Sequence, residues 1–125
     1  MIDHIGIEVS DYQTAVDFYK RALAPLGYEL LIEVQGFAGF GPKNTGGPVA
    51  NFWIHQGNKP THQIHISFTA SDRNTVNLFY GSALNAGGKD NGAPGVREIY
   101  HPHYYGAFVL DPDGNNIEAV CHKQS

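Results

Sequence analysis

The chain has 125 residues, the size of one domain or of two small modules that share a core. It carries 8 Lys and Arg against 12 Asp and Glu and has no basic cluster that would bind nucleic acid. It also lacks an apolar run of roughly 20 residues that could span a membrane and the pattern of a secretory signal, so we expect a cytoplasmic protein. Its one cysteine excludes an internal disulfide and a cysteine-based zinc site, whereas seven histidines offer groups for metal binding or proton transfer.

The first predicted element is a strand over residues 2–9, whose alternation places apolar residues on one face and His4, Gly6 and Glu8 on the other. A helix follows, with Ser10 as the predicted N-cap in a capping box and Gly27 as its stop. Strands are predicted next over 29–34, 36–41 and 49–55, with a loop at 42–48 and a linker over 56–62.

The second half of the chain repeats the first. When His4 is set against His65, ten of the 24 positions from His4 to Gly27 are identical to those from His65 to Gly88, without a gap. The repeat predicts a strand over 64–69 and a second helix, and strands follow over 97–100, 105–110 and 115–122. A tight turn is predicted at 111–114.

Each half therefore has the order βαβββ, and neither half buries its sheet alone. We predict an α+β fold in a single domain, 1–125, made of a first module at 1–56 and a second at 62–125. The two modules would form a curved mixed sheet around a cleft, with the helices outside.

Three side chains are candidates for metal ligands. His4 and His65 occupy equivalent positions on the polar faces of the two first strands, and Glu118 lies on the last strand. Two imidazoles and a carboxylate suit Zn, Fe, Mn, Ni or Co, and three protein ligands leave coordination positions open for a substrate. The residue equivalent to Glu118 in the first module is Trp53, which cannot ligate a metal.

Three further residues are candidates for catalytic roles. His55 shares a strand face with Trp53, and we expect it to act as a fourth ligand or as an acid or base near the metal. His103, like its neighbour His101, is either a proton shuttle or substrate contact at the mouth of the cleft or an ordinary loop residue. Tyr105 begins an apolar strand and could offer its hydroxyl to a bound oxygen.

Several segments together resemble the vicinal oxygen chelate superfamily, which includes glyoxalase I, fosfomycin-resistance proteins, bleomycin-resistance proteins and extradiol dioxygenases. The resemblance covers nearly the whole chain and rests on the opening HIGIEV, the helical DFY, the echo HISF and the closing block GAFVLDPDGNNIE. It implies two βαβββ modules and a divalent metal that chelates two adjacent oxygens of a small molecule. Carried over, His4, His65 and Glu118 match three usual ligand positions, while Trp53 stands where a fourth, often a glutamate, is found.

The resemblance leaves the reaction open. A glyoxalase-like lyase or isomerase and an extradiol-type dioxygenase both fit, although the missing carboxylate at Trp53 weighs against glyoxalase I activity itself. The alternative is a metal-free protein that binds an aromatic metabolite or drug, as bleomycin-resistance relatives do. A small-molecule substrate is expected in every case, and the modules could pair within one chain or across a homodimer.

Overall fold

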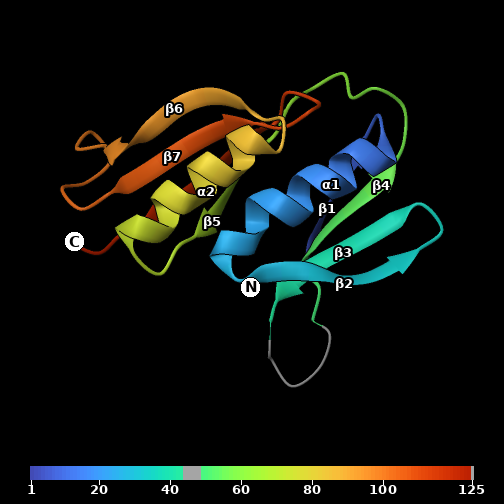
Figure 1. The fold of residues 1–125 in the computed structure, drawn as a ribbon, viewed down its shortest axis with the longest axis horizontal. Helices are drawn as coiled ribbons and strands as arrows, with labels where there is room; N and C mark the ends of the chain where they lie inside the picture. Colours follow the sequence, from blue (N-terminus) through green and yellow to red (C-terminus); the bar gives the residue numbers. More distant parts are fainter. Residues whose placement is uncertain (44–48, 125) are drawn as a thin grey trace.

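The computed structural model describes residues 1–43 and 49–124, so the predicted loop at 42–48 lies mostly outside the described residues. The elements follow one another in the order βαβββ twice, as predicted (Figure 1). The first set is β1 (Ile5–Val9), α1 (Tyr12–Leu23), the short 3-10 helix η1 (Ala24–Leu26), β2 (Tyr28–Val34), β3 (Phe37–Pro42) and β4 (Phe52–Gln56). The second set is β5 (His65–Thr69), α2 (Arg73–Asn85), β6 (Lys89–Val96), β7 (Tyr105–Leu110) and β8 (Asn116–Cys121).

Each module forms its own four-stranded mixed sheet. The strand orders are β1-β4-β3-β2 and β5-β8-β7-β6, with the first two strands of each order parallel and the remaining pairs antiparallel. Gly6 pairs with Trp53 in the first sheet, and Ser67 pairs with Glu118 in the second. Trp53 and Glu118 therefore occupy equivalent positions, and the predicted α+β class is confirmed.

Helix α1 begins one residue later than the capping box predicted. Asp11 is the N-cap of α1 and accepts a hydrogen bond from the Thr14 amide, and Asp72 caps α2 through the Thr75 amide in the same way. The predicted cap, Ser10, instead donates its hydroxyl to Asp113, 2.5 Å away in the turn before β8. Ser10 thus joins the two modules, a contact between distant residues that local spacing cannot reveal.

A shared aromatic core holds the modules together. Tyr19 of α1 packs edge-on against Phe52 of β4 at 4.9 Å between ring centroids, and Phe52 packs against Phe68 of β5 at 5.5 Å. The Tyr19 hydroxyl donates to the buried carboxylate of Asp111, which also accepts from the backbone amide of Asn115 at 2.8 Å. Asp111 therefore holds the predicted turn at 111–114.

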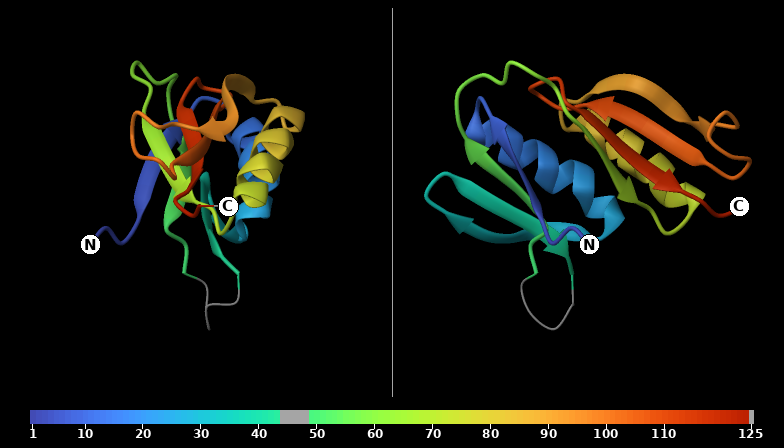
Figure 2. Two further views of the ribbon diagram at one scale, coloured as in Figure 1. Left: turned by 90° about the vertical axis from the view of Figure 1, so that its left-hand side faces the viewer. Right: turned by 180° about the vertical axis from the view of Figure 1, so that it is seen from behind.

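Both helices lie on the same side of the molecule. Helices α1 and α2 contact each other, and in Figure 2 the strands of both sheets lie on the side opposite the helices. Apolar residues of the first strands, such as Val9 and Phe68, are buried toward the helices, as the alternation predicted. We call the two sheet surfaces turned away from the helices the open faces. They point to the same side, so they do not face each other within one chain.

One strand prediction is wrong. The segment 97–100 was expected to be a strand, but the strand at this edge of the sheet is β6, Lys89–Val96, and a turn follows it. β6 contains Gly92, Pro94 and Gly95, which are typical of loops, and its pairing with β7 shifts register twice. Such residues are tolerated at a sheet edge, where a missing ladder bond costs little.

Within the described residues, neither α-helix has the length and apolar character needed to cross a bilayer.

Candidate functional site

The structure brings two of the three predicted ligands together on the open face of the second sheet. His65 at the start of β5 and Glu118 in the middle of β8 come from neighbouring parallel strands, and His65 Nε2 lies 2.9 Å from Glu118 Oε1. Glu118 is 1% exposed, whereas the imidazole is half-exposed. Among the described residues, His65 is the only ion-pair partner of this buried carboxylate.

Tyr104 occupies the other side of the same carboxylate. Its hydroxyl donates to Glu118 Oε2, and burial, reinforced by this hydrogen bond, raises the pKa of Tyr104 well above its ordinary value. The phenol therefore remains a hydrogen-bond donor at neutral pH. A Cβ atom at Gly106 would come within 3.2 Å of both Glu118 Oε2 and Tyr104 Cε1, so the glycine leaves room for their contact.

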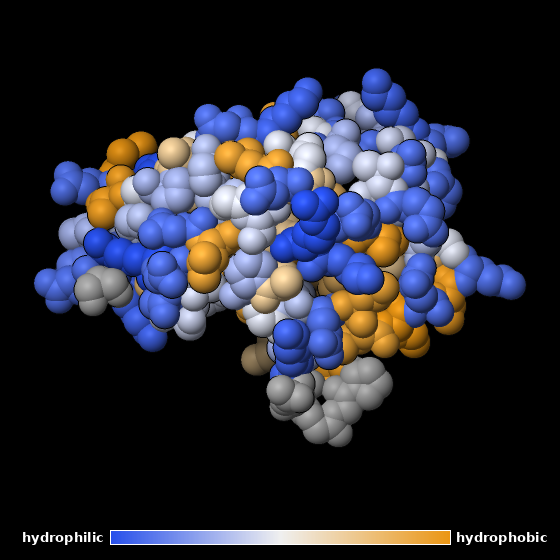
Figure 3. All heavy atoms as spheres, viewed as in Figure 1, coloured by the Kyte–Doolittle hydropathy of each residue, from blue (hydrophilic) through white to orange (hydrophobic). Residues whose placement is uncertain are grey.

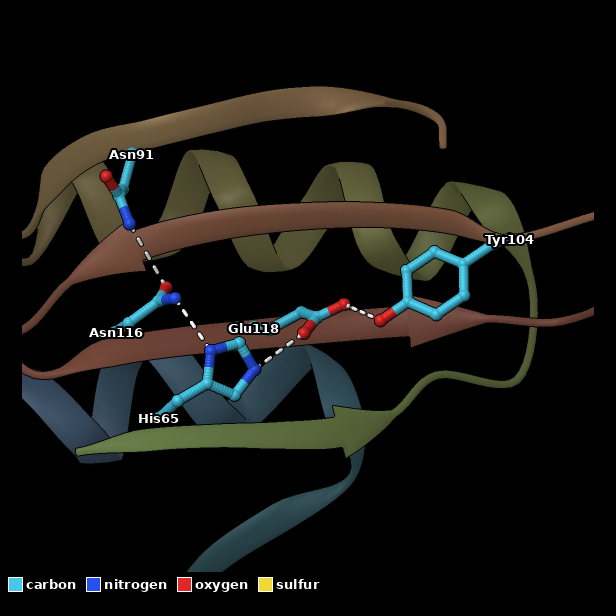
Figure 4. A network of polar contacts seen from close by, with 5 residues as sticks. All are labelled: His65, Asn91, Tyr104, Asn116 and Glu118. Carbon is cyan, nitrogen blue, oxygen red and sulfur yellow. Dashed lines mark hydrogen bonds and ion pairs between the residues drawn. The ribbon is translucent and has the colours of Figure 1, made fainter. Parts of the chain in front are cut away.

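The imidazole of His65 is fixed from both sides. Asn116 Nδ2 donates to His65 Nδ1 at 2.7 Å, and Asn91 Nδ2 donates to Asn116 Oδ1 at 3.2 Å (Figure 4). The Phe108 ring packs beside the imidazole at 6.1 Å between centroids.

A pocket of about 380 Å³ adjoins this pair. Apart from Glu118, its walls are imidazole and aromatic rings, and the lining consists of His65, Tyr100, His101, Tyr104, Phe108, Glu118 and His122. Such a pocket has the size and the mixture of apolar walls and few polar groups typical of small-molecule sites.

Two further histidines form a pair in the wall of this pocket. His101 Nε2 lies 2.7 Å from His122 Nδ1, and the Tyr104 ring packs against both rings. The His103 backbone amide donates to His101 Nδ1 at 3.0 Å, which leaves the His101 proton on Nε2. His101 Nε2 therefore donates to His122 Nδ1.

The third predicted ligand, His4, lies elsewhere. It is exposed, its Nδ1 contacts Asp3 at 2.6 Å, and it lines a different pocket with Ser67, Phe68 and Thr69. His4 and His65 therefore line different pockets. Within the described part of the chain, no three His, Cys, Asp or Glu side chains meet in a group that could hold a metal ion.

The three predicted catalytic residues do not meet in this pocket. His55 lies on the open face of the first sheet and stacks on Phe37 at 5.2 Å between ring centroids. The Tyr105 hydroxyl donates to Asn77 of α2 at 2.7 Å, so this side chain lies on the helix side of the second sheet. His103 is exposed and is not among the residues that line the pocket.

The sequence indicated no role for Asn116 or His122, and it favoured Tyr105, whereas the tyrosine that contacts Glu118 is Tyr104. Asn116, Glu118 and the residues that alternate with them up to His122 share one strand face, and this alternation is the signal that could have found both residues. Tyr104 had no comparable signal, because it precedes β7 and only the turn over 97–104 sets its direction.

The donor set fits a divalent cation. Two ligand atoms at about 2.1 Å from a shared ion are roughly 3.0 to 3.4 Å apart at octahedral or tetrahedral angles, close to the 2.9 Å between His65 Nε2 and Glu118 Oε1. His65 and Glu118 can thus supply two ligands, and the set needs at least one more.

Solved structures share this fold. They include a glyoxalase/bleomycin resistance protein from Albidiferax ferrireducens T118, with TM-score 0.78 and 23% identity over 94% of this chain and 95% of that one. A glyoxalase/bleomycin resistance protein/dioxygenase family enzyme from Burkholderia phytofirmans PsJN has TM-score 0.73 and 18% identity, over 98% of both chains. A glyoxalase I mutant from Zea mays has TM-score 0.72 and 19% identity, over 95% of this chain and 46% of that one.

No curated protein sequence gives a significant match to this chain. A family model does: the model described as Glyoxalase/Bleomycin resistance protein/Dioxygenase superfamily matches residues 1–119. This match covers both modules, and it agrees with the resemblance to vicinal oxygen chelate proteins that the repeated motifs indicated. The chain therefore belongs to the Glyoxalase/Bleomycin resistance protein/Dioxygenase superfamily.

Proposed function

We propose that the protein is a metal-dependent enzyme that acts on a small molecule with two adjacent oxygen atoms. His65 and Glu118 would hold the cation, and His4 of a second copy of the chain would complete the ligand set. The observation that carries this proposal is the contact of 2.9 Å between His65 Nε2 and the buried carboxylate of Glu118.

The second copy is needed because His4 cannot reach the pair from its own chain. His4 lines one pocket together with Ser67 and Thr69, whereas His65 lines a different pocket together with Glu118. Both open faces of one chain also point to the same side (Figure 2). A twofold axis would set the open face of each first module against the second module of the partner, and would give two equivalent sites.

The surface of the first module supports this pairing. Ile32, Val34 and Phe37 lie on its open face, because their cross-strand partners Gly39, Phe37 and His55 face the same way. All three are between 41% and 54% exposed. Apolar side chains at the β2–β3 hairpin are visible even from the helix side (Figure 3). Contact with a second copy would remove this apolar area from water.

The roles of the chain's own residues follow from the geometry. A divalent cation supplies Lewis-acid chemistry to two adjacent oxygens of a small molecule. Tyr104 donates to Glu118 Oε2, which fixes the carboxylate and leaves Oε1 directed at His65. Tyr100 and Phe108 provide aromatic walls that orient a substrate. His55 lies on the same open face as His4. The second copy of the chain that supplies His4 would therefore also bring its His55 close to the metal site.

Metal analysis tests the proposal. We expect the protein, purified without a metal-affinity tag, to bind about one Zn, Fe, Mn, Ni or Co ion per chain as a dimer, and to lose this binding in His65→Ala. Iron dependence together with O₂ uptake on catechols would identify a dioxygenase. Turnover with Ni, Zn or Co in the absence of O₂ would identify a lyase or isomerase. A chain that binds no metal and keeps its affinity for aromatic ligands in chelator would instead be a binding protein.

A further inference from the structure

Four hydrogen bonds in series run through the site. Asn91 of β6 donates to Asn116 of β8, Asn116 donates to His65 Nδ1, and His65 contacts Glu118, which accepts from Tyr104 (Figure 4). An amide nitrogen can only donate, so His65 Nδ1 accepts in this arrangement. The imidazole proton is therefore on Nε2, where it points at Glu118 Oε1 at 2.9 Å.

This tautomer cannot bind a cation through Nε2. A ligating nitrogen must have a free lone pair, and the other ring nitrogen then carries the proton and needs an acceptor. In the present arrangement Asn116 offers His65 a donor rather than an acceptor. The amide therefore stabilises the form of His65 that pairs with Glu118 and opposes the form that binds metal.

We propose that Asn116, supported by Asn91, selects the tautomer of His65, and that both amides turn over when a cation binds; this inference rests on the proposed metal function. A half-turn exchanges amide oxygen and nitrogen at nearly the same positions. Asn116 Oδ1 then accepts from His65 Nδ1–H, and Asn116 Nδ2 donates to Asn91 Oδ1. One proton leaves Nε2 for solvent and one arrives at Nδ1, so the imidazole stays neutral.

An asparagine suits this role because it satisfies both states. A carboxylate at this position could only accept and would hold the Nδ1–H tautomer at all times. An aliphatic residue could do neither, and would leave Nδ1–H without a partner in the metal-bound form. The arrangement is specific to the second module. The repeat-equivalent Asn51 accepts from the Tyr28 hydroxyl at 2.7 Å, and the partner of His4 is Asp3.

Nitrogen NMR of the histidine rings, recorded on the full chain at a pH where His65 is neutral, tests the proposal. We expect the Nε2–H tautomer in the metal-free protein and Nδ1–H after addition of Zn²⁺. In Asn116→Leu the Kd for Zn²⁺ should rise about 10- to 100-fold, the usual effect of losing the partner of a metal-bound histidine. Asn51→Leu, which removes the equivalent amide of the first module, should leave the Kd within about twofold.

Asn116→Asp separates the tautomer from the metal function. An acceptor at this position should convert metal-free His65 to Nδ1–H and keep the Kd for Zn²⁺ at or below that of the wild type. Unchanged Nε2–H in this variant, or an unchanged Kd in Asn116→Leu, would overturn the inference. A wild-type chain that binds no Zn²⁺ overturns the proposed function instead, and the spectrum of metal-free Asn116→Asp still decides whether Asn116 selects the tautomer.

Discussion

The open faces of the two modules have the same backbone and different chemistry. In the second module, Glu118 contacts His65 and Tyr104 in a pocket walled mainly by aromatic and imidazole rings. In the first module the equivalent residue is Trp53, whose ring lies over Gly39. A Cβ atom at Gly39 would come within 2.9 Å of the Trp53 ring, so this glycine leaves space for the indole.

The residue at one equivalent position, Trp53 or Glu118, therefore distinguishes the two open faces. The histidines at equivalent positions differ for the same reason. His65 has Glu118 and Asn116 as partners, whereas His4 has only its exposed neighbour Asp3 within the described residues. Under the proposed metal function, the first module would offer one ligand and an exposed apolar surface, and the second would offer two ligands and a pocket.

The largest predicted effect comes from changing Glu118, with a change at the equivalent residue Trp53 as the control. Glu118→Gln keeps the shape of the side chain but removes its charge, so the affinity for Zn²⁺ should fall by more than about 100-fold, beyond the loss typical of residues outside the ligand set. Trp53→Phe should leave it nearly unchanged, because Trp53 is not a ligand. Isothermal titration of both variants checks this, and equal losses would remove the distinction between the modules.

The glycines at the helix ends sharpen the comparison. Gly88 is identical to Gly27 in the repeat, but a Cβ atom there would meet Val109 Cγ1 at 2.4 Å and Phe18 Cε1 at 2.9 Å. Gly88→Ala should therefore lower the free energy of unfolding by about 1–3 kcal/mol through overpacking. Gly27 has open space but a φ of 84°, so Gly27→Ala should cost about 1 kcal/mol. Chemical denaturation that ranks them in reverse order would contradict this explanation.

The identical tyrosines of the two helices should also behave differently. Tyr19 is fully buried against Asp111, and burial raises its pKa well above the ordinary value, whereas Tyr80 bonds Asp90 at the surface. Tyr19→Phe should cost about 1–2 kcal/mol at pH 7, because a buried hydrogen bond is lost.

The raised pKa of Tyr19 also sets a pH dependence. The buried phenol favours the protonated form, so its contribution is fully present below pH 10, the ordinary pKa, and is lost as the pH rises above that value. Unfolding measured between pH 9 and 11 should show a smaller loss of stability in Tyr19→Phe than in the wild type. Tyr80→Phe should stay closer to the wild-type curve, because Tyr80 is at the surface and its pKa is raised mainly by the hydrogen bond to Asp90.

The repeat made much of the fold predictable. Ten identities and strict alternation in the first strands located both modules, both helices and the face that carries His65. The strand β6 escaped prediction because Gly92, Pro94 and Gly95 are loop formers that an edge strand tolerates. Local spacing assigned Ser10 to a helix cap. Its actual partner, Asp113, lies about one hundred positions away, and local spacing cannot predict such a contact.

The site was only partly predictable for a related reason. Alternation shows which face of a strand is open, and so it placed His65 and Glu118 correctly with respect to each other. It does not show how two modules pack as rigid bodies, and the expected convergence of His4 depended on that packing. The direction of Tyr104 was also not predictable, because this residue precedes β7 and strand alternation does not extend to it.

A subunit-mixing experiment tests most directly whether one site needs two chains. His4→Ala and His65→Ala should each lose tight Zn²⁺ binding alone. After the two variants are unfolded and refolded together, random pairing should give dimers with one intact site, about one tightly bound ion per four chains. A mixture that binds no better than its separate components, or a His4→Ala protein that binds like the wild type, would contradict the shared site.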